Sequence, residues 1–298
     1  YRSIITGHSS TEPVLIFARR KTGVRAPMEV SVGPIRNLQG RIIGGIEVFR
    51  DMTESLQDLL RAKVIQDIAM DSSLPPDDRV TFEVCYLPRN IVGGDFYRIE
   101  QRDTDNYALM VADATGHGVA GALCAMQLGS LWNDHHQELA SPARLLEVFN
   151  ERLHPLVHEA GYFATAVCLS YNAANGQLGC VRAGHPAPLL FRANGTIEAV
   201  GRPQLALGLF PRGQYQETTL QLSPGDALLV FTDGAVELFD SAEHELGTEG
   251  LKEFVREQTI GQPAGNFHAA RLKEQLLRFS NRIQLPDDLT LLILRRRS

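Results

Sequence analysis

Cysteine is scarce in this chain: there are four in 298 residues, and no two of them are spaced as a CxxC pair. The four stand far apart, each among apolar neighbours: Cys85, Cys124, Cys168 and Cys180. A disulfide framework or a structural zinc site needs cysteines grouped at short, regular spacings. The sequence therefore predicts a reduced, cytoplasmic chain with buried thiols.

Long apolar runs and an excess of basic residues are missing as well. No stretch approaches the ~20 apolar residues of a membrane-spanning helix, and no signal peptide is visible. The formal net charge is −6, and we interpret the basic triplet at 295–297 as a solvated strand end. We therefore expect no nucleic-acid partner and no membrane segment in this stretch. Because the sequence begins at Tyr1 rather than at methionine, we expect a piece of a longer protein.

The chain does have many short β-type runs, separated by turns and helical patterns. The β-type runs fall at 80–87, 106–112, 163–171, 177–183, 188–193, 217–222, 226–232 and 288–295. Asn-Gly pairs at 175–176 and 194–195 stand between neighbouring runs, which indicates antiparallel pairing through tight turns. Helical patterns fall at 118–135, 142–160, 249–259 and 264–281. We predict an α+β fold with antiparallel sheets and helices packed outside them.

The N-terminal part has a different pattern. Residues 28–50 alternate like two half-buried strands around a turn at 37–40, which is typical of a β-hairpin. A helical pattern follows, and its apolar stripe consists of Leu56, Leu60, Val64 and Ile68. The prolines at 75–76 stop this helix. With about two domains expected at this length, we divide the chain into 1–53, a linker helix at 54–74, and 75–298.

Acidic residues stand at the ends of several apolar runs, where an isolated charge is costly. They lie in the motifs VGGDFY (92–97), DATGHG (113–118), FTDGAVE (231–237) and DDLT (287–290). Their acids are Asp95, Asp113, Asp233, Asp287 and Asp288. Strand ends can converge at one edge of a sandwich, and clustered carboxylates there need a multivalent cation. Oxygen ligands favour Mg²⁺ or Mn²⁺, and a pair of such ions can activate water against a phosphoryl group.

Each motif alone also has a purely structural reading. Asp-Gly at 233–234 is most often only a turn, and Asp-Asp after Pro286 is a common loop or helix cap. Two glycines before Asp95 suit a β-bulge, and a histidine within GHG is often an ordinary structural group. The functional interpretation depends on the four motifs occurring together at strand ends.

In this order, and with AGHPAPLL (183–190) between the second and third, the motifs resemble the PPM-type metal-dependent protein phosphatases of the SpoIIE/RsbU branch. The resemblance covers about residues 75–296. It implies an αββα sandwich of two antiparallel sheets flanked by helices, with two Mn²⁺ or Mg²⁺ ions at one edge. It also implies serine/threonine phosphatase activity.

The resemblance implies a role for each acid. Asp113 would bridge both ions, with the Ala114 carbonyl as a further ligand, and Asp95 would hold one ion. Asp233 and Asp287 would hold the other. Asp288 is the less favoured of the acidic pair, because the branch usually uses the first acid.

Other positions in the motifs receive lesser roles. His117 is a candidate general acid for the leaving serine oxygen, and His185 would support the site through hydrogen bonds. The glycines expected to allow close approach are Gly94, Gly116 and Gly234. Arg98 stands where the branch commonly has an acid. It either touches the substrate phosphate or is simply solvated.

Residues 18–54 resemble the C-terminal half of a PAS sensor domain, ending in its D-x-T motif at 51–53. The apolar stripe that follows would then belong to a signalling helix that pairs with its copy in a homodimer. The alternative is that the stripe packs on the chain's own phosphatase domain.

The resemblance implies a cytoplasmic phosphatase under PAS-linked control. Its substrate would be a phosphorylated anti-sigma-factor antagonist of the STAS type. One alternative is a signalling scaffold with an inactive phosphatase-like domain, against which the complete set of acids argues. Another is a metal-dependent hydrolase of small phosphoesters. The signal sensed and the choice between Mn²⁺ and Mg²⁺ stay open.

Overall fold

The computed structural model describes residues 14–70, 76–116, 118–281 and 285–297. The chain divides into two compact units, Tyr1–Ile65 and Gln66–Ser298. The predicted boundary between residues 74 and 75 lies outside the described residues. No helix in the described ranges is both long and apolar enough to span a membrane.

The N-terminal unit holds a three-stranded antiparallel sheet and most of helix α2 (Thr53–Ala69). Its strands are β1 (Val14–Arg19), β2 (Arg25–Arg36) and β3 (Ile42–Asp51). The predicted hairpin is confirmed by the antiparallel pairing of β2 with β3. The Asn37 side chain shapes its turn by accepting hydrogen bonds from the backbone N–H groups of Gln39 and Arg41, at 3.1 and 2.9 Å. The sequence pattern did not predict β1, whose apolar run does not alternate.

The second unit contains two larger sheets. The first has the order β10-β9-β13-β14-β4, and the second has the order β11-β8-β7-β6-β5 with β12 paired to β8. The strands of the five-stranded sheet are β4 (Val80–Leu87), β9 (Leu189–Phe191), β10 (Ile197–Ala199), β13 (Ala227–Phe231) and β14 (Leu289–Arg296). Those of the six-stranded sheet are β5 (Asp95–Gln101), β6 (Asn106–Ala114), β7 (Ala164–Asn172), β8 (Gln177–Ala183), β11 (Pro203–Gln204) and β12 (Thr218–Gln221).

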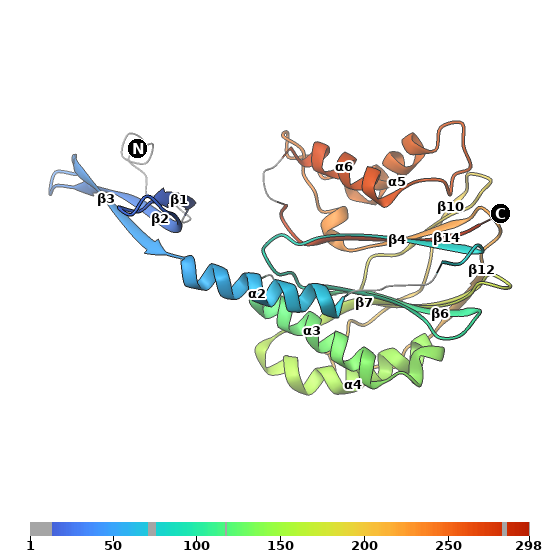
Figure 1. The fold of residues 1–298 in the computed structure, drawn as a ribbon. Helices are drawn as coiled ribbons and strands as arrows, with labels where there is room; N and C mark the ends of the chain where they lie inside the picture. Colours follow the sequence, from blue (N-terminus) through green and yellow to red (C-terminus); the bar gives the residue numbers. More distant parts are fainter. Residues whose placement is uncertain (1–13, 71–75, 117, 282–284, 298) are drawn as a thin grey trace. The chain divides into compact units, whose positions relative to one another are not determined.

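The two sheets stack face to face, and helices cover their outer faces (Figure 1). Helices α3 (Val119–Asp134) and α4 (Pro142–Val157) pack on the six-stranded sheet. Helices α5 (Gly247–Gln258) and α6 (Ala269–Ser280) pack on the five-stranded sheet. Short 3₁₀ turns complete the unit: η1 (Glu138–Ala140), η2 (His158–Ala160) and η3 (Asp233–Ala235). The predicted αββα sandwich is confirmed.

Apolar cores fill the three spaces between these layers. The outer cores contain Trp132 of α3 and Phe267 just before α6, and the core between the sheets contains Tyr107 and Tyr171. Alternation along each strand sends one set of side chains to the helices and the other to the facing sheet. Three of the four free cysteines are buried, as predicted, and Cys85 is half-buried. Two pairings among the described residues depart from the antiparallel rule: β11 runs parallel to β8 over two residues, and a single parallel bridge joins Ala166 to Gly184.

Candidate metal centre and active site

The five acids gather at one edge of the sandwich, where strands of both sheets begin or end. We call Asp95, Asp113, Asp233, Asp287 and Asp288 the acidic edge. In the six-stranded sheet, Asp95 opens β5 and pairs directly with Asp113 near the end of β6. In the five-stranded sheet, Asp233 follows the end of β13, and the acidic pair at 287–288 precedes β14, which is antiparallel to β13. The fold thus brings together residues far apart in the sequence.

The carboxylate of Asp95 fastens the two sheets to each other at this edge. Its Oδ2 accepts hydrogen bonds from the hydroxyls of Thr232 at 3.0 Å and Thr290 at 2.6 Å, both in the opposite sheet region. Thr290 N–H in turn donates to Thr232 Oγ1 at 2.9 Å. Asp95 Oδ1 is also buried, but it has no hydrogen-bond partner among the described residues. A buried carboxylate oxygen without a partner is costly and marks a place where a ligand would be stabilised.

The two acids before β14 have different surroundings. Asp288 is buried, and its Oδ1 and Oδ2 accept hydrogen bonds from the backbone N–H groups of Arg89 and Gly94, each at 2.6 Å. Asp287 is exposed, and its Oδ1 accepts from Asp288 N–H at 2.8 Å. Asp288 therefore holds the loop that leads into Asp95, whereas Asp287 keeps an oxygen available at the surface.

Close backbone approaches at the acidic edge explain two of the glycines. A Cβ on Gly234 would overlap the Asp288 carbonyl oxygen. A Cβ on Gly94 would lie 3.0 Å from the Ala114 carbonyl oxygen. Gly116 has a positive φ of 90°, which favours glycine, and a Cβ there would collide with Tyr162. The three predicted supporting glycines thus allow the motif loops to pack against one another.

The electrostatics of the acidic edge are unfavourable for the protein alone. Burial, followed by the charges of Asp233, Asp287 and other acids, raises the pKa of Asp113 to about 8. Burial and the neighbouring Asp287 raise the pKa of Asp233 to about 6. Burial and Asp113 raise the pKa of Asp95 well above its ordinary value. The charged neighbours responsible for these shifts are all acidic, so a cation at this edge would relieve both repulsion and desolvation.

The acids line an edge rather than closing a cage. In the described ranges, no three side chains of His, Cys, Asp or Glu converge tightly enough to enclose an ion by themselves. Mg²⁺ keeps several of its waters and usually binds one or two carboxylates, whereas structural zinc needs a closed set of protein ligands. The donor set, all oxygen and partly exposed, therefore fits hydrated hard cations.

A family model decides the classification. The model described as Stage II sporulation protein E (SpoIIE) matches residues 103–297, well over half of the chain. The match includes Asp113, Asp233 and Asp287, and Asp95 lies just ahead of it. The chain belongs to the SpoIIE family. It therefore carries a phosphatase domain of the SpoIIE type, as the motif resemblance implied.

Individual relatives in Bacillus subtilis (strain 168) agree with this SpoIIE assignment. The chain is 28% identical over 164 residues to the phosphoserine phosphatase RsbP, covering 54% of this chain and 41% of RsbP. It is 25% identical over 264 residues to the phosphoserine phosphatase RsbU, covering 88% of this chain and 73% of RsbU. The match thus spans less than half the length of RsbP.

Solved structures share the fold of this SpoIIE-type chain. The PP2C domain of SiaA from Pseudomonas aeruginosa has a TM-score of 0.69 at 20% identity, covering 81% of this chain and 97% of that one. The PP2C domain of SpoIIE from Bacillus subtilis, with a fragment of its regulatory domain, has a TM-score of 0.61 at 15% identity. That comparison covers 95% of this chain and 82% of the SpoIIE chain.

The remaining predicted residues of the SpoIIE motifs lie in different surroundings. His185 is buried beside the acidic edge: its Nδ1 lies 2.7 Å from Oγ1 of Thr165, which pairs with Asp113 across the sheet. Burial lowers the pKa of His185 to about 3, so its ring is neutral. His117 lies outside the described residues. Arg98 is half-buried and donates to the Ala69 carbonyl at 3.0 Å, so it is not simply solvated.

Sequence reasoning missed several residues that hold the SpoIIE-type site. Thr232 and Thr290 stand inside the motifs FTDGAVE and DDLT, in which only the acids and Gly234 were predicted to have a role. Gln66 in α2 is buried, and its amide makes two hydrogen bonds to the backbone of Gly93: Nε2 donates to the carbonyl at 2.8 Å, and Oε1 accepts from N–H at 3.2 Å. The signal in the sequence that could have indicated this role was the polar Gln66 among the apolar residues of the helix. The last turn of α2 thus holds the loop before Asp95.

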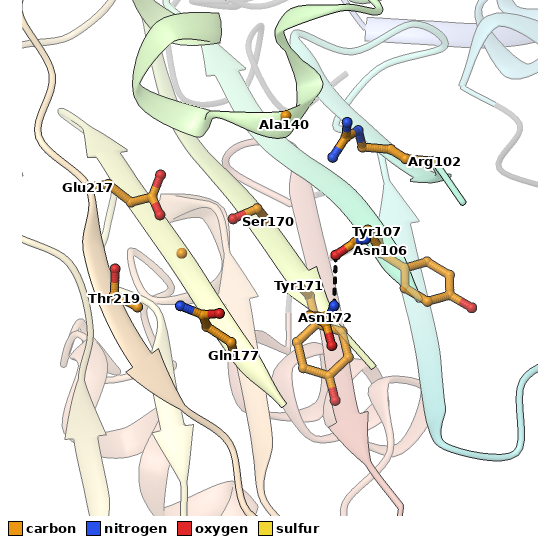
Figure 2. A pocket seen from close by; sticks show the side chains of 11 residues that line it. Arg102, Asn106, Tyr107, Ala140, Ser170, Tyr171, Asn172, Gln177, Glu217 and Thr219 are labelled. Carbon is orange, nitrogen blue, oxygen red and sulfur yellow. Dashed lines mark hydrogen bonds between the residues drawn. The ribbon is translucent and has the colours of Figure 1, made fainter. Parts of the chain in front are cut away.

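A polar hollow of about 200 Å³ lies at the other end of the six-stranded sheet (Figure 2). Asn106 at the start of β6 and Asn172 at the end of β7 line it, together with Ser170 and Gln177. Asn106 and Asp113 are seven residues apart on one strand, so the hollow lies about 20 Å from the acidic edge. It is not part of the candidate active site.

Proposed function

We propose that this SpoIIE-family chain is a metal-dependent serine/threonine protein phosphatase. The observation that carries the proposal is the acidic edge itself, where strand ends from both sheets bring five acids together, and where the buried Oδ1 of Asp95 has no hydrogen-bond partner among the described residues. Among the described residues, the charged neighbours that raise the pKa values of Asp95, Asp113 and Asp233 are themselves acids. Two divalent cations would compensate these charges, and RsbX, a structural relative at 17% identity and a TM-score of 0.56, has been solved in complex with magnesium.

The surroundings of each acid support an assignment of ligands. Asp113 is proposed to bridge two Mn²⁺ or Mg²⁺ ions, aided by the Ala114 carbonyl. Asp95 would hold one ion through its free Oδ1, and Asp233 with Asp287 would hold the other. Asp288 is proposed to position Gly94 and Asp95, because both of its oxygens already accept backbone hydrogen bonds.

Bound ions of this kind supply an activated water and compensate the charge of the phosphoryl oxygens. The residues of the chain have complementary tasks. Thr232 and Thr290 hold the carboxylate of Asp95 through Oδ2, which leaves Oδ1 as its proposed metal-binding oxygen. His185 supports β7 behind Asp113 through Thr165. His117 is proposed to protonate the leaving serine or threonine oxygen.

The proposed substrate is a phosphorylated anti-sigma-factor antagonist of the STAS type in the cytoplasm. Two curated relatives, RsbP and RsbU, are named phosphoserine phosphatases, which supports serine phosphate as the group removed. An edge that is open to solvent also suits a phosphorylated residue presented by another protein. A small metabolite, by contrast, is usually enclosed in a deep pocket.

We further propose that the PAS-like N-terminal unit controls the site through α2 and that α2 pairs with its copy in a homodimer. The helix carries an exposed apolar stripe, with Leu60 at 50%, Val64 at 58% and Ile68 at 70% exposure. Its last turn carries Gln66, whose amide holds Gly93 two residues before Asp95. A change in helix pairing therefore has a short route to the acidic edge.

The test of the proposed function is phosphate release with and without Mn²⁺. We expect the chain to hydrolyse p-nitrophenyl phosphate and a serine-phosphorylated STAS protein only when Mn²⁺ or Mg²⁺ is present. A nucleotide and a sugar phosphate serve as controls for a general phosphoesterase. No release from any substrate at millimolar Mn²⁺ would favour the scaffold alternative.

A further inference from the structure

A short loop between β11 and β12 presents apolar side chains to solvent. We call residues 205–210 the apolar loop. Leu205 is 55% exposed, Leu209 is 44% exposed and Phe210 is 51% exposed. Single exposed apolar residues are normal on a protein surface, but three within six residues form a local patch, and such patches often mark interaction sites.

The apolar loop is held firmly although its tips are exposed. Leu207 is fully buried and exchanges two backbone hydrogen bonds with Ala164, at 2.8 and 2.9 Å. Asn150 of α4, itself 1% exposed, donates from Nδ2 to the Phe210 carbonyl at 3.0 Å and accepts from Gly208 N–H at 2.9 Å. A buried amide that bonds both ends of a tripeptide fixes its backbone. The exposed leucine and phenylalanine are therefore presented in a set shape, with little ordering cost on binding.

The apolar loop lies beside the acidic edge. Leu207 forms a bridge to Ala164, the first residue of β7, and Ala164 pairs with Ala114 at the end of β6. The next pair along these strands is Thr165 with Asp113. Two strand spacings therefore separate Leu207 from Ala114, a distance of about 10 Å. A protein that places a phosphoserine at Asp113 can therefore lay its neighbouring surface over this loop.

We propose that the apolar loop is the docking surface for the folded phosphoprotein substrate. This inference rests on the proposed phosphatase function and adds to it where the substrate protein binds. The occupant is a globular protein that carries an apolar patch beside its phosphoserine. Arg202 and Arg212, both exposed, flank the loop and suit an acidic rim on that protein. The surface selects folded phosphoproteins over short phosphopeptides.

The test compares three substrates on two loop variants, Leu209→Asp and Phe210→Ser. The substrates are a serine-phosphorylated STAS protein, the phosphoserine heptapeptide with its local sequence, and p-nitrophenyl phosphate. We expect each variant to lower kcat/KM for the folded protein about tenfold or more, in line with loss of an apolar anchor. Turnover of the peptide and of p-nitrophenyl phosphate should stay within about twofold of wild type. Ile260→Asp, at a residue 79% exposed beyond the end of α5, is the matched control and should change none of the three.

Two results would overturn the docking proposal. One is an unchanged kcat/KM for the folded protein in both variants. The other is an equal loss on all three substrates, since the loop would then act on the catalytic centre instead of on docking. Sedimentation of wild type and variants adds a third check: a dimer that the substitutions dissociate would mean that a second copy occupies the loop.

A binding measurement tests the docking surface even if the proposed phosphatase function fails. If wild type releases no phosphate from any substrate, the dissociation constant for the phosphorylated STAS protein still tests docking. It is measured without added metal, by titration calorimetry. Weakening of about tenfold in Leu209→Asp, with no change in Ile260→Asp, supports the docking surface independently of turnover. Equal affinities in all three proteins refute it.

Discussion

The two ends of strand β6 carry polar side chains in opposite situations. At the Asn106 end, the side chains of Asn106, Asn172 and Asp103 satisfy one another: Asn172 Nδ2 donates to Asn106 Oδ1 at 2.9 Å (Figure 2), and the Asp103 carboxylate accepts from the Asn106 side chain and backbone. At the Asp113 end, carboxylate faces carboxylate, and the buried Oδ1 of Asp95 has no partner among the described residues.

This difference separates a polar surface from a site that needs a ligand. Both ends are hollow or open, and both are rich in hydrogen-bonding groups, so polarity alone does not distinguish them. Protein interiors normally pair their buried polar groups. Acids that repel one another at the end of a sheet are stabilised when a cation binds there. Perturbed pKa values are a known mark of such functional sites.

The largest effect should follow from Asp113→Asn. Removing one negative charge from the proposed bridging position should lower phosphate release at least about 100-fold, more than typical losses for residues around a metal. The metal-free melting temperature should not fall, because the substitution relieves acid–acid repulsion. Asn172→Ala at the opposite end of the sheet should keep wild-type turnover. Wild-type rates in Asp113→Asn at saturating Mn²⁺ would remove Asp113 from the site.

Thr290→Val should give the next largest effect. The substitution keeps the shape of the side chain but deletes the hydroxyl that donates to Asp95 at 2.6 Å. Loss of a residue that orients a metal ligand typically costs 10- to 100-fold, so we expect about a tenfold higher Mn²⁺ requirement. Thr219→Val, in the polar hollow, is the control. Equal Mn²⁺ titration curves for both variants and wild type would show that Asp95 needs no orientation.

Much of this arrangement could be predicted from the sequence, because local patterns encode it. The runs at 80–87 and 177–183 match β4 and β8 residue for residue, and Asn-Gly turns follow where expected. β5 was missed, although its residues 97–100 alternate between apolar and charged side chains, and seven pairs with β6 define the strand.

The contacts that complete the site could not be predicted in this way. Asp95 bonds to Thr232 and Thr290 across 137 and 195 residues, and Asp288 bonds to Gly94 across 194. Such pairings depend on how the two sheets stack, which a single sequence does not display. The motif resemblance assigned metal-binding roles to the acids, and it favoured Asp287 over Asp288 only because the family usually uses the first acid of the pair. The backbone hydrogen bonds to Asp288 now offer a physical reason for the same choice.

Mn²⁺ should stabilise the folded protein by several degrees. A ligand that binds only the native state at 100 times its Kd adds about 2.7 kcal/mol, and each kcal/mol raises Tm by about 2–4 °C for a domain of this size. Asp233→Asn should reduce this gain, whereas Asp103→Asn at the other end of the sheet should leave it intact. Thermal melts across millimolar Mn²⁺ measure it. A Tm independent of Mn²⁺ would contradict a metal site at the acidic edge.

The smallest effect concerns control of the site by α2. Leu60→Glu places a charge in the middle of the exposed stripe, so it should weaken self-association if that stripe pairs two copies. Phosphate release should change severalfold, because the same helix ends in the turn where Gln66 holds Gly93. Mn²⁺ affinity should change little, since the acidic edge itself is intact.

Gln66→Ala separates self-association through α2 from the contact of α2 with Gly93. It leaves the apolar stripe untouched, so sedimentation should match wild type. The buried backbone groups of Gly93 lose their partner, however, which typically costs about 1–3 kcal/mol, and activity should fall severalfold. Control through α2 requires Leu60→Glu to alter both association and activity, and Gln66→Ala to alter activity alone. A wild type that is monomeric at high concentration would reduce the helix to a linker, and unchanged activity in Gln66→Ala would remove its route to Asp95.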